Sequence, residues 1–157
     1  MGVKSNLASF TRPSNTTAYA AGDLVANDTT AGNVAAMSLN WGGSLNGHLR
    51  RIILRTSNAT IALGNFHVWL FRVDPSALVT NGDNSALAGL SFTTYGLIHV
   101  APVNLYASMS GVGGWGESTY DPGLAELPQT VYALLEARAA YVPASAEVFS
   151  LQIEVTP

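Results

Sequence analysis

The sequence contains no cysteine. This absence excludes disulfide bonds, thiolate metal sites and a cysteine nucleophile. Charge is also scarce, since Asp, Glu, Lys and Arg make up 11% of the 157 residues, against roughly a quarter in a typical globular domain. A chain of this size ordinarily needs surface charge to stay in solution. We therefore expect partners to cover part of its surface.

Strongly charged regions and long apolar runs are missing as well. The formal net charge of −3 does not support nucleic acid or an anionic membrane surface as a partner. No apolar run approaches the roughly 18 residues of a membrane span, and the first ten residues lack the apolar stretch of a secretion signal. We expect one domain, residues 1–157, long enough to bury an ordinary core.

The sequence is rich in short segments with the pattern of β-strands. In Phe66–Val73 both alternating faces are apolar, which predicts a strand in the centre of its sheet. One face would pack in the core, and the other would be covered by residues 108–128 or by a neighbouring subunit. Glu147–Val155 alternates more cleanly and predicts a strand with one core face and one wet face.

Other segments complete the predicted sheet. Thr130–Ala140 suits a helix or a strand, and we favour a strand because its neighbours are strands. Residues 108–128 read as a long glycine-rich loop, and residues 1–12 hold a short strand, 8–12, or an N-terminal arm. The remaining predicted strands are 24–26, 33–39, 49–56, 95–101 and 103–107. Short strands between Gly-, Pro- and Asn-rich turns predict an all-β fold, an antiparallel two-sheet sandwich of jelly-roll type.

Motifs that would carry chemistry are weak. Residues 111–116 match the glycine spacing of a dinucleotide-binding loop, but no βαβ unit surrounds them. Three histidines that met across adjacent strands could bind zinc, but nothing in their spacing requires it. One oxygen-rich loop offers calcium ligands but lacks the further acidic residues of an EF-hand, and a turn explains it equally well. The acidic residues of the 108–128 stretch are spaced like ordinary loop charges. These candidates are His48, His67, His99; Asn81, Asp83, Asn84; and Glu117, Asp121, Glu126. We expect no catalytic residues, no cofactor and no metal, and hence no enzyme.

Arginines and aromatic residues are the better candidates for a functional surface. Three of the seven basic residues fall within 49–56. On an exposed strand arginine discourages edge pairing, whereas at an interface it pairs with carboxylates of a partner. The candidate interface residues are Arg50, Arg51, Arg55, Trp69, Phe71, Trp115 and Tyr120.

Four blocks of the chain, Phe10–Asn27, Leu49–Thr56 (LRRIILRT), Phe66–Gly89 and Tyr132–Val155, resemble small virion proteins of tailed bacteriophages. The group is the capsid cement or decoration proteins with a jelly-roll fold. The resemblance implies a homotrimer that binds the major capsid protein on the outside of an icosahedral capsid and strengthens the shell. It further implies location in the virion after synthesis in the host cytoplasm, without direct contact to nucleic acid or membrane.

A binding module is the alternative interpretation. Jelly-roll domains of phage tail spikes or fibres that bind glycans or receptors use exposed aromatic side chains. Trp41, Trp115 and Tyr120 lie in predicted loops where they could serve this purpose. A fold does not choose between the two functions.

Overall fold

The alternating pattern of the last strand shows how this chain builds its sheet. Phe149, Leu151, Ile153 and Val155 are fully buried, while the residues between them are half-buried. Neighbouring strands share this period of two, so their apolar faces meet in one core. The computed structural model describes residues 2–42, 47–61, 63–89, 94–107, 112–120 and 126–156.

Ten strands and two short 3-10 helices make up the described part of the chain. The strands are β1 (Lys4–Thr11), β2 (Leu24–Val25), β3 (Met37–Asn40), β4 (Gly47–Thr56), β5 (Leu63–Phe71), β6 (Leu97–Ala107), β7 (Gly114–Thr119), β8 (Glu126–Leu127), β9 (Thr130–Ala137) and β10 (Val148–Thr156). The helices are η1 (Ala31–Asn33) and η2 (Ser76–Leu78). Neither helix is long and apolar enough to cross a lipid bilayer.

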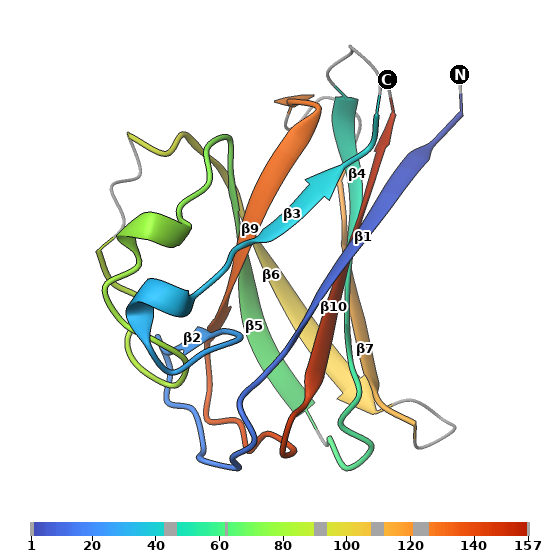
Figure 1. The fold of residues 1–157 in the computed structure, drawn as a ribbon. Coiled ribbons are helices and arrows are strands. Elements are labelled where there is room, and N and C mark those ends of the chain that lie inside the picture. The colour runs from blue at the N-terminus through green and yellow to red at the C-terminus, as the bar shows by residue number, and fades with distance from the viewer. Residues whose placement is uncertain are drawn as a thin grey trace.

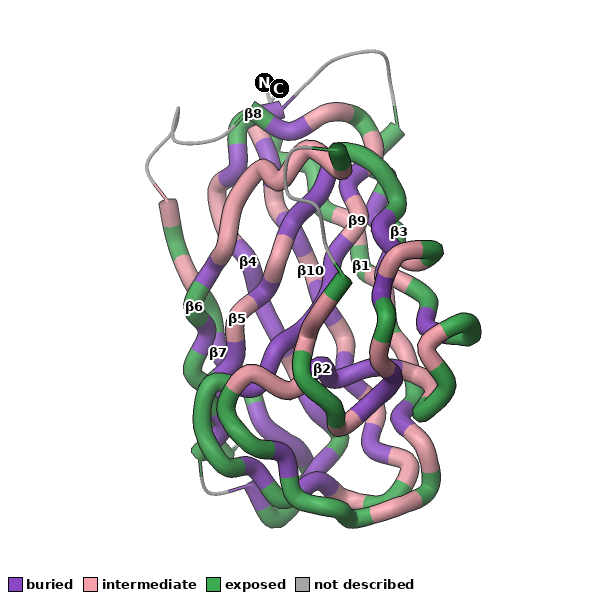
Figure 2. The backbone as a smooth tube through the Cα atoms, turned by 90° about the vertical axis from the view of Figure 1, so that its left-hand side faces the viewer, coloured by how far each residue is buried: buried purple, intermediate pink, exposed green. Residues whose placement is uncertain are grey.

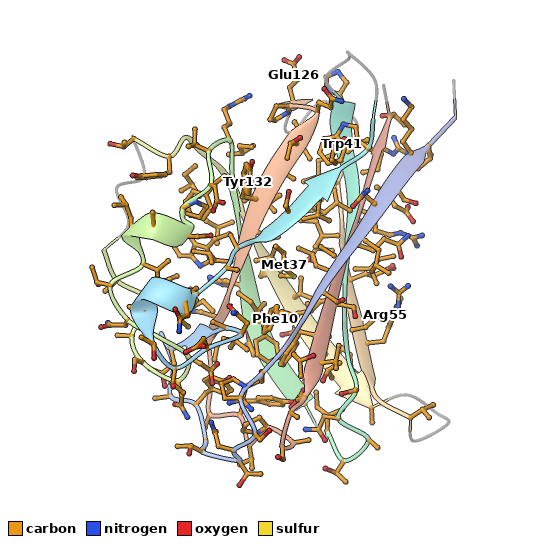
Figure 3. The ribbon with its side chains drawn as sticks, in the orientation of Figure 1. Phe10, Met37, Trp41, Arg55, Glu126 and Tyr132 are labelled. Carbon is orange, nitrogen blue, oxygen red and sulfur yellow. The ribbon has the colours of Figure 1, made fainter. Side chains whose placement is uncertain are left out.

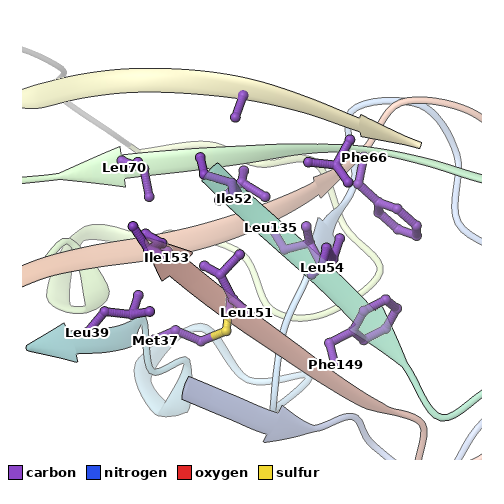
Figure 4. Packing of buried hydrophobic residues seen from close by; sticks show 14 of the residues in the cluster. Met37, Leu39, Ile52, Leu54, Phe66, Leu70, Leu135, Phe149, Leu151 and Ile153 are labelled. Atoms are coloured by element: carbon purple, nitrogen blue, oxygen red, sulfur yellow. The ribbon is translucent and has the colours of Figure 1, made fainter. Parts of the chain in front are cut away.

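The strands form one antiparallel sheet in the order β1-β10-β4-β7-β6-β5-β9-β2, and β3 and β8 pair with β9 and β4. The sheet curls until its edge strands β1 and β3 approach each other (Figure 1). Apolar side chains from its facing parts meet in the interior (Figure 4). The prediction of an all-β antiparallel fold of sandwich or jelly-roll type is confirmed. The two layers of the sandwich are parts of one continuous hydrogen-bonded sheet that folds over on itself.

The central position predicted for the Phe66–Val73 segment is confirmed, because β5 lies between β6 and β9. Its inner face carries Phe66, Val68 and Leu70 into the main core. The prediction for its outer face is wrong, since neither residues 108–128 nor a neighbouring subunit is needed to cover it. Phe71 is fully buried in a second apolar cluster.

This second cluster lies outside the sheet and is built by the chain itself. It joins the outer faces of β5 and β9 to the segments that carry β2, η1 and η2. Figure 2 shows these segments in front of β5 and β9 with an exposed outer surface. The members of the cluster are Leu24, Ala26, Val34, Phe71, Val79 and Leu134. Val79 follows β5 closely, but Leu24, Ala26 and Val34 lie far from it in the sequence. The period of two in β5 therefore does not indicate which segments cover it.

The stretch 108–128 is not one long loop. It contains β7, which pairs with β4 over six residues, and the short strand β8. Glycines 114 and 116 lowered the apparent strand propensity of β7, yet at Gly116 tertiary packing demands glycine. A Cβ there would lie 1.9 Å from the carbonyl oxygen of Asn104, so only glycine lets β6 and β7 approach so closely.

Three further predictions concern the ends of strands. Residues 1–12 do not form an arm, because β1 pairs with β10 along all eight of its residues. Pro102 does not divide β6. The Pro102 carbonyl oxygen accepts a hydrogen bond from the Ser118 hydroxyl on β7, so the Pro102 nitrogen faces β7 as well. In the described residues only Tyr106 and Ala107 of β6 pair with β7. The missing amide proton of Pro102 therefore removes no hydrogen bond of that ladder. The strand preferred for Thr130–Ala140 is confirmed over Thr130–Ala137, which form β9, whereas residues 138–140 lie beyond its end.

Candidate interaction surface

The two outer faces of the curled sheet differ in how they are covered. Segments with β2, η1 and η2 cover β5 and β9, on the left of Figure 1. On the right, no described segment lies over the outer side of β1, β10, β4 and β7. A sheet face open to water normally carries polar and charged side chains. This face does carry charged and polar side chains, among them Arg51, Glu117 and Glu154, but the large aromatic side chain of Trp115 is exposed beside them.

A row of outward-facing side chains runs from the exposed first residue of β5 across β6 and β7 to β4, and so reaches this open face. Leu63 on β5 is opposite Tyr106 on β6, and Tyr106 is opposite Trp115 on β7. Trp115 is opposite Arg55 on β4. Directly opposed residues of antiparallel strands point to the same face. We call Leu63, Tyr106, Trp115 and Arg55 the outer row.

The outer row is conspicuously apolar for a surface. Leu63, Tyr106 and Trp115 are 56%, 57% and 43% exposed. Arg55 extends away from the core (Figure 3) and donates a hydrogen bond to Gln152 Oε1 over 3.1 Å. Contiguous exposed apolar side chains on a protein surface mark places where another molecule binds. Tyrosine, tryptophan and arginine are the residues enriched where interfaces derive most of their energy.

A shallow groove of about 380 Å³ runs beside the outer row. Tyr106 and Trp115 form its aromatic part, and Asn104 and Glu117 add an amide and a carboxylate. The Glu117 carboxylate is held by Arg51 at 3.2 Å. Flat aromatic surfaces next to fixed hydrogen-bonding groups suit an amphipathic ligand.

Charges on the open face compensate one another. Arg51 bonds Glu117 at 3.2 Å and Glu154 at 2.9 Å. With Arg55 the face has two arginines against two glutamates, and its net charge is zero. A face whose charges compensate one another does not repel a second copy of itself or a weakly charged partner.

The structure separates the predicted interface residues into three groups. Arg51, Arg55 and Trp115 lie together on the open face. Phe71 and Trp69 belong to the covered face, where Trp69 Nε1 donates to Glu136 Oε2 over 2.8 Å. Arg50 lies on β4 and Tyr120 directly follows β7, and the Tyr120 amide donates to the Arg50 carbonyl oxygen over 2.9 Å.

Two of the three predicted loop aromatics are directed inward. Trp41 is buried near one end of the main core (Figure 3). Tyr120 packs against the same core, with its ring 4.9 Å from that of His99, and burial raises the pKa of its phenol. Trp115 alone of the three is available to a ligand.

The predicted ligand sets do not assemble. His48 is exposed on β4, His67 lies on the outer face of β5, and His99 faces Tyr120. No group of three or more His, Cys, Asp or Glu side chains in the described part of the chain is arranged to hold a metal. Asp83 is buried against Arg12. Asp121 lies outside the described residues, and so does Gly111 of the glycine motif.

Two histidines give the fold a pH dependence. Burial lowers the pKa of His99. The pKa of His67 is also lowered, mainly by burial and in addition by the positive charge of Arg138, while the carboxylate of Glu136 partly opposes this shift. A histidine whose pKa is lower in the folded state takes up protons preferentially when the chain unfolds. Its contribution to stability is therefore complete above the unfolded pKa of about 6.5 and is lost as the pH falls below it.

We expect the melting temperature to fall between pH 7.5 and 5.5, and the His99→Gln variant to show a shallower fall. Thermal unfolding at closely spaced pH values measures both. The imidazole proton resonances provide a direct control. A His99 that titrates at or above 6.5 in the folded protein would contradict the argument.

Several important residues were missed by sequence reasoning. Leu63 and Tyr106 are not among the predicted interface residues. The alternation of Asn104, Leu105 and Tyr106 would have placed the tyrosine on the solvent-exposed face of its strand. Arg12 was also missed, and no local pattern marks it, because its partner Asp83 lies 71 positions away.

Comparisons with known proteins place few constraints on this chain. No protein-family model matches it, and no curated protein sequence matches it. Among solved structures, it is similar to a chain described as PRD1 vertex protein P5, with a TM-score of 0.40 and 10% identity over 98% of this chain and 73% of that chain. A likeness of this degree does not establish a shared fold or a shared function.

Proposed function

We propose that this protein is a structural component of a tailed-bacteriophage virion, a homotrimer that binds the major capsid protein on the outside of an icosahedral capsid and stabilises the shell. In this proposal the protein is not an enzyme. The observation that carries it is the outer row, in which the large side chains of Leu63, Tyr106 and Trp115 are exposed next to one another, beside charges that compensate each other. The resemblance of four sequence blocks to capsid cement proteins supports the same assignment.

The proposed mechanism is preferential binding to one state of the shell. A protein that binds the assembled capsid and not its separate subunits stabilises the assembly by mass action. Capsid symmetry repeats each contact many times, and a trimer engages three sites at once, so individually weak contacts give a large total effect. No chemical step is required.

Shell binding by single variants tests the proposal. Truncating a tryptophan at the centre of an interface costs about 2 kcal/mol or more. We therefore expect Trp115→Ala to weaken binding to shells assembled from the major capsid protein by about 30-fold or more, since 1.4 kcal/mol is tenfold in affinity. Tyr106→Ala should act in the same direction. Co-sedimentation with the shells measures the affinity, and light scattering measures the oligomeric state.

The matched control is Val142→Ala, which shortens an apolar side chain that is 67% exposed but lies outside the open face. It should bind shells like the unaltered protein. A monomer that does not bind shells at all would exclude the proposal. Equal loss of binding in the Trp115 and Val142 variants would show that the open face is not the contact.

A second candidate function is favoured by the groove beside the outer row. Its aromatic pair and the polar groups of Asn104 and Glu117 suit a saccharide, as expected of a glycan- or receptor-binding module from a tail spike or fibre. A glycan array with the unaltered protein, Trp115→Ala and Glu117→Gln separates the functions. Saturable sugar binding that both substitutions abolish, without shell binding, would favour this second candidate.

A further inference from the structure

The two edges of the curled sheet face each other without joining. β1 forms one edge and β3 lies on the other side of the gap, and no backbone–backbone hydrogen bond among the described residues connects them. At one end, side chains bridge the gap. Lys4 Nζ donates to the Gly42 carbonyl oxygen over 3.4 Å, and Asn6 Nδ2 donates to the Asn40 carbonyl oxygen.

Beyond this closed end the gap widens into a groove. Its volume is about 480 Å³, and its two walls are Leu7–Thr11 on β1 and Ala35–Ser38 leading into β3. Phe10 and Met37 mark the two sides in Figure 3. All the residues that line the groove are uncharged, and none of them is proline.

The amides of the two residues before β3 are occupied, whereas one edge of β1 has no partner strand. On the β3 side, the Ala35 amide donates to Asn27 Oδ1 and the Ala36 amide donates to Ser76 Oγ, each over 2.8 Å. On the β1 side, one edge of the strand is paired with β10, and the other edge presents its amides and carbonyls to the groove. An exposed strand edge without charge or proline is a template for another strand.

We propose that this groove binds a single extended, uncharged segment of another polypeptide, which adds to the free edge of β1 as a further strand. A row of backbone groups at the β-sheet spacing recognises a peptide backbone, whereas a small molecule needs convergent polar side chains. Five residues, Leu7–Thr11, accommodate a strand of roughly 16 Å.

A tethered strand tests the site without knowledge of the natural partner. The probe is the full chain with the segment TVSVTV joined to its N-terminus by about 15 Gly and Ser residues, a length that spans roughly 20 Å on average. Tethering raises the effective concentration of the probe to about the millimolar range. The control fusion carries TPSPTP, which lacks alternate backbone donors.

Amide hydrogen exchange across Leu7–Thr11 is the measurement. In the unfused protein, the amides that face the groove should exchange quickly, because they have no ladder partner. In the TVSVTV fusion they should exchange about tenfold more slowly or better, and the TPSPTP fusion should behave like the unfused protein. Unchanged exchange in both fusions would overturn the proposal, and so would equal protection by both.

A matched pair of lysine substitutions locates the added strand. Ser9 and Ser150 are opposed on β1 and β10, and they share residue type and sheet face. Lysine at the edge position, Ser9→Lys, should reduce protection in the TVSVTV fusion several-fold, while Ser150→Lys should leave it unchanged. An equal effect of both would place the segment on the open face instead of in the groove. The test uses no capsid shells, so its outcome is independent of the function proposed above.

Discussion

Replacing Asp83 with alanine is expected to lower the free energy of unfolding by about 3–5 kcal/mol, the cost of leaving one partner of a buried ion pair without the other. The Arg12 Nη2 atom lies 2.8 Å from Asp83 Oδ2, and both side chains are fully buried. The same carboxylate accepts hydrogen bonds from the Tyr19 hydroxyl over 2.5 Å and from the Ala26 amide over 2.9 Å. Alanine removes every one of these contacts.

The position of this pair explains why its loss should affect the whole fold. Arg12 follows β1, and Asp83 lies in the turn after η2, where it also binds the Ala26 amide of the segment that carries β2. The Arg12 guanidinium also lies 4.8 Å from the centre of the Tyr19 ring. Burial, reinforced by the hydrogen bond to Asp83, raises the pKa of Tyr19 well above its ordinary value. The Tyr19 hydroxyl therefore stays protonated and donates a hydrogen bond to Asp83.

Denaturant unfolding measures the change, and Glu154→Ala is the control. Glu154 pairs with Arg51 at a similar distance, 2.9 Å, but at a surface where the Arg51 side chain is 39% exposed. Its loss should cost less than about 1 kcal/mol, because water solvates the separated charges. Equal effects of the two substitutions would contradict the argument.

A double variant separates the pair from its surroundings. Arg12→Met combined with Asp83→Leu removes both buried charges and keeps apolar volume. Such replacements are often neutral or stabilising, so the double variant should unfold at a higher denaturant concentration than Asp83→Ala alone. If it is less stable than Asp83→Ala, hydrogen bonds to Tyr19 and the backbone outweigh the ion pair.

Replacing Phe149 with alanine is the second change for which we expect a large effect, a loss of about 3–5 kcal/mol. Phe149 is fully buried on β10. Its ring lies 5.5 Å from Phe66 in an edge-to-face arrangement and 5.8 Å from Phe10 in a stacked one. Figure 4 shows Phe66 and Phe149 at the same end of the core. Truncation would leave a cavity that these rings, anchored on separate strands, cannot close.

Phe10→Ala is the matched control, because Phe10 is half-buried on the edge strand β1 and borders the groove. It should cost clearly less than Phe149→Ala. Phe149→Leu should also cost less, since most of the buried volume remains. The slope of unfolding free energy against denaturant should be unchanged in all three. A loss at Phe149 no larger than at Phe10 would mean that the core collapses around the cavity.

The covered outer face of β5 shows what residue patterns can and cannot predict. Two apolar faces indicated a central strand, and that prediction is confirmed by β6 and β9 on either side. The identity of the cover was wrong, because Phe71 is buried by segments carrying Leu24, Val34 and Val79. A strand's own residues determine that a face must be buried. What buries it depends on how distant parts of the chain fold back.

Only some residues of the outer row on the open face could be predicted from the sequence. Arg55 and Trp115 were recognised as interface candidates, while Leu63 and Tyr106 were not. These four residues come from four strands, and only the registers of the ladders align them. A shift of one residue in any register would turn a side chain to the opposite face. The outer row therefore depends on how the four strands pair with one another, and the sequence of any one strand does not reveal it.

By itself, the sequence determined the class of this protein, because the alternation of apolar and polar residues is a local property that specifies strands and an all-β core. The cysteine-free, weakly charged composition likewise pointed to a surface that needs partners. Tertiary structure alone decided that Arg12 meets Asp83, that Gly114–Thr119 is a strand, that one outer face stays open, and that β1 and β3 leave a groove between them. Each of these depends on residues far apart in the chain, whose contact exists only after the sheet has curled.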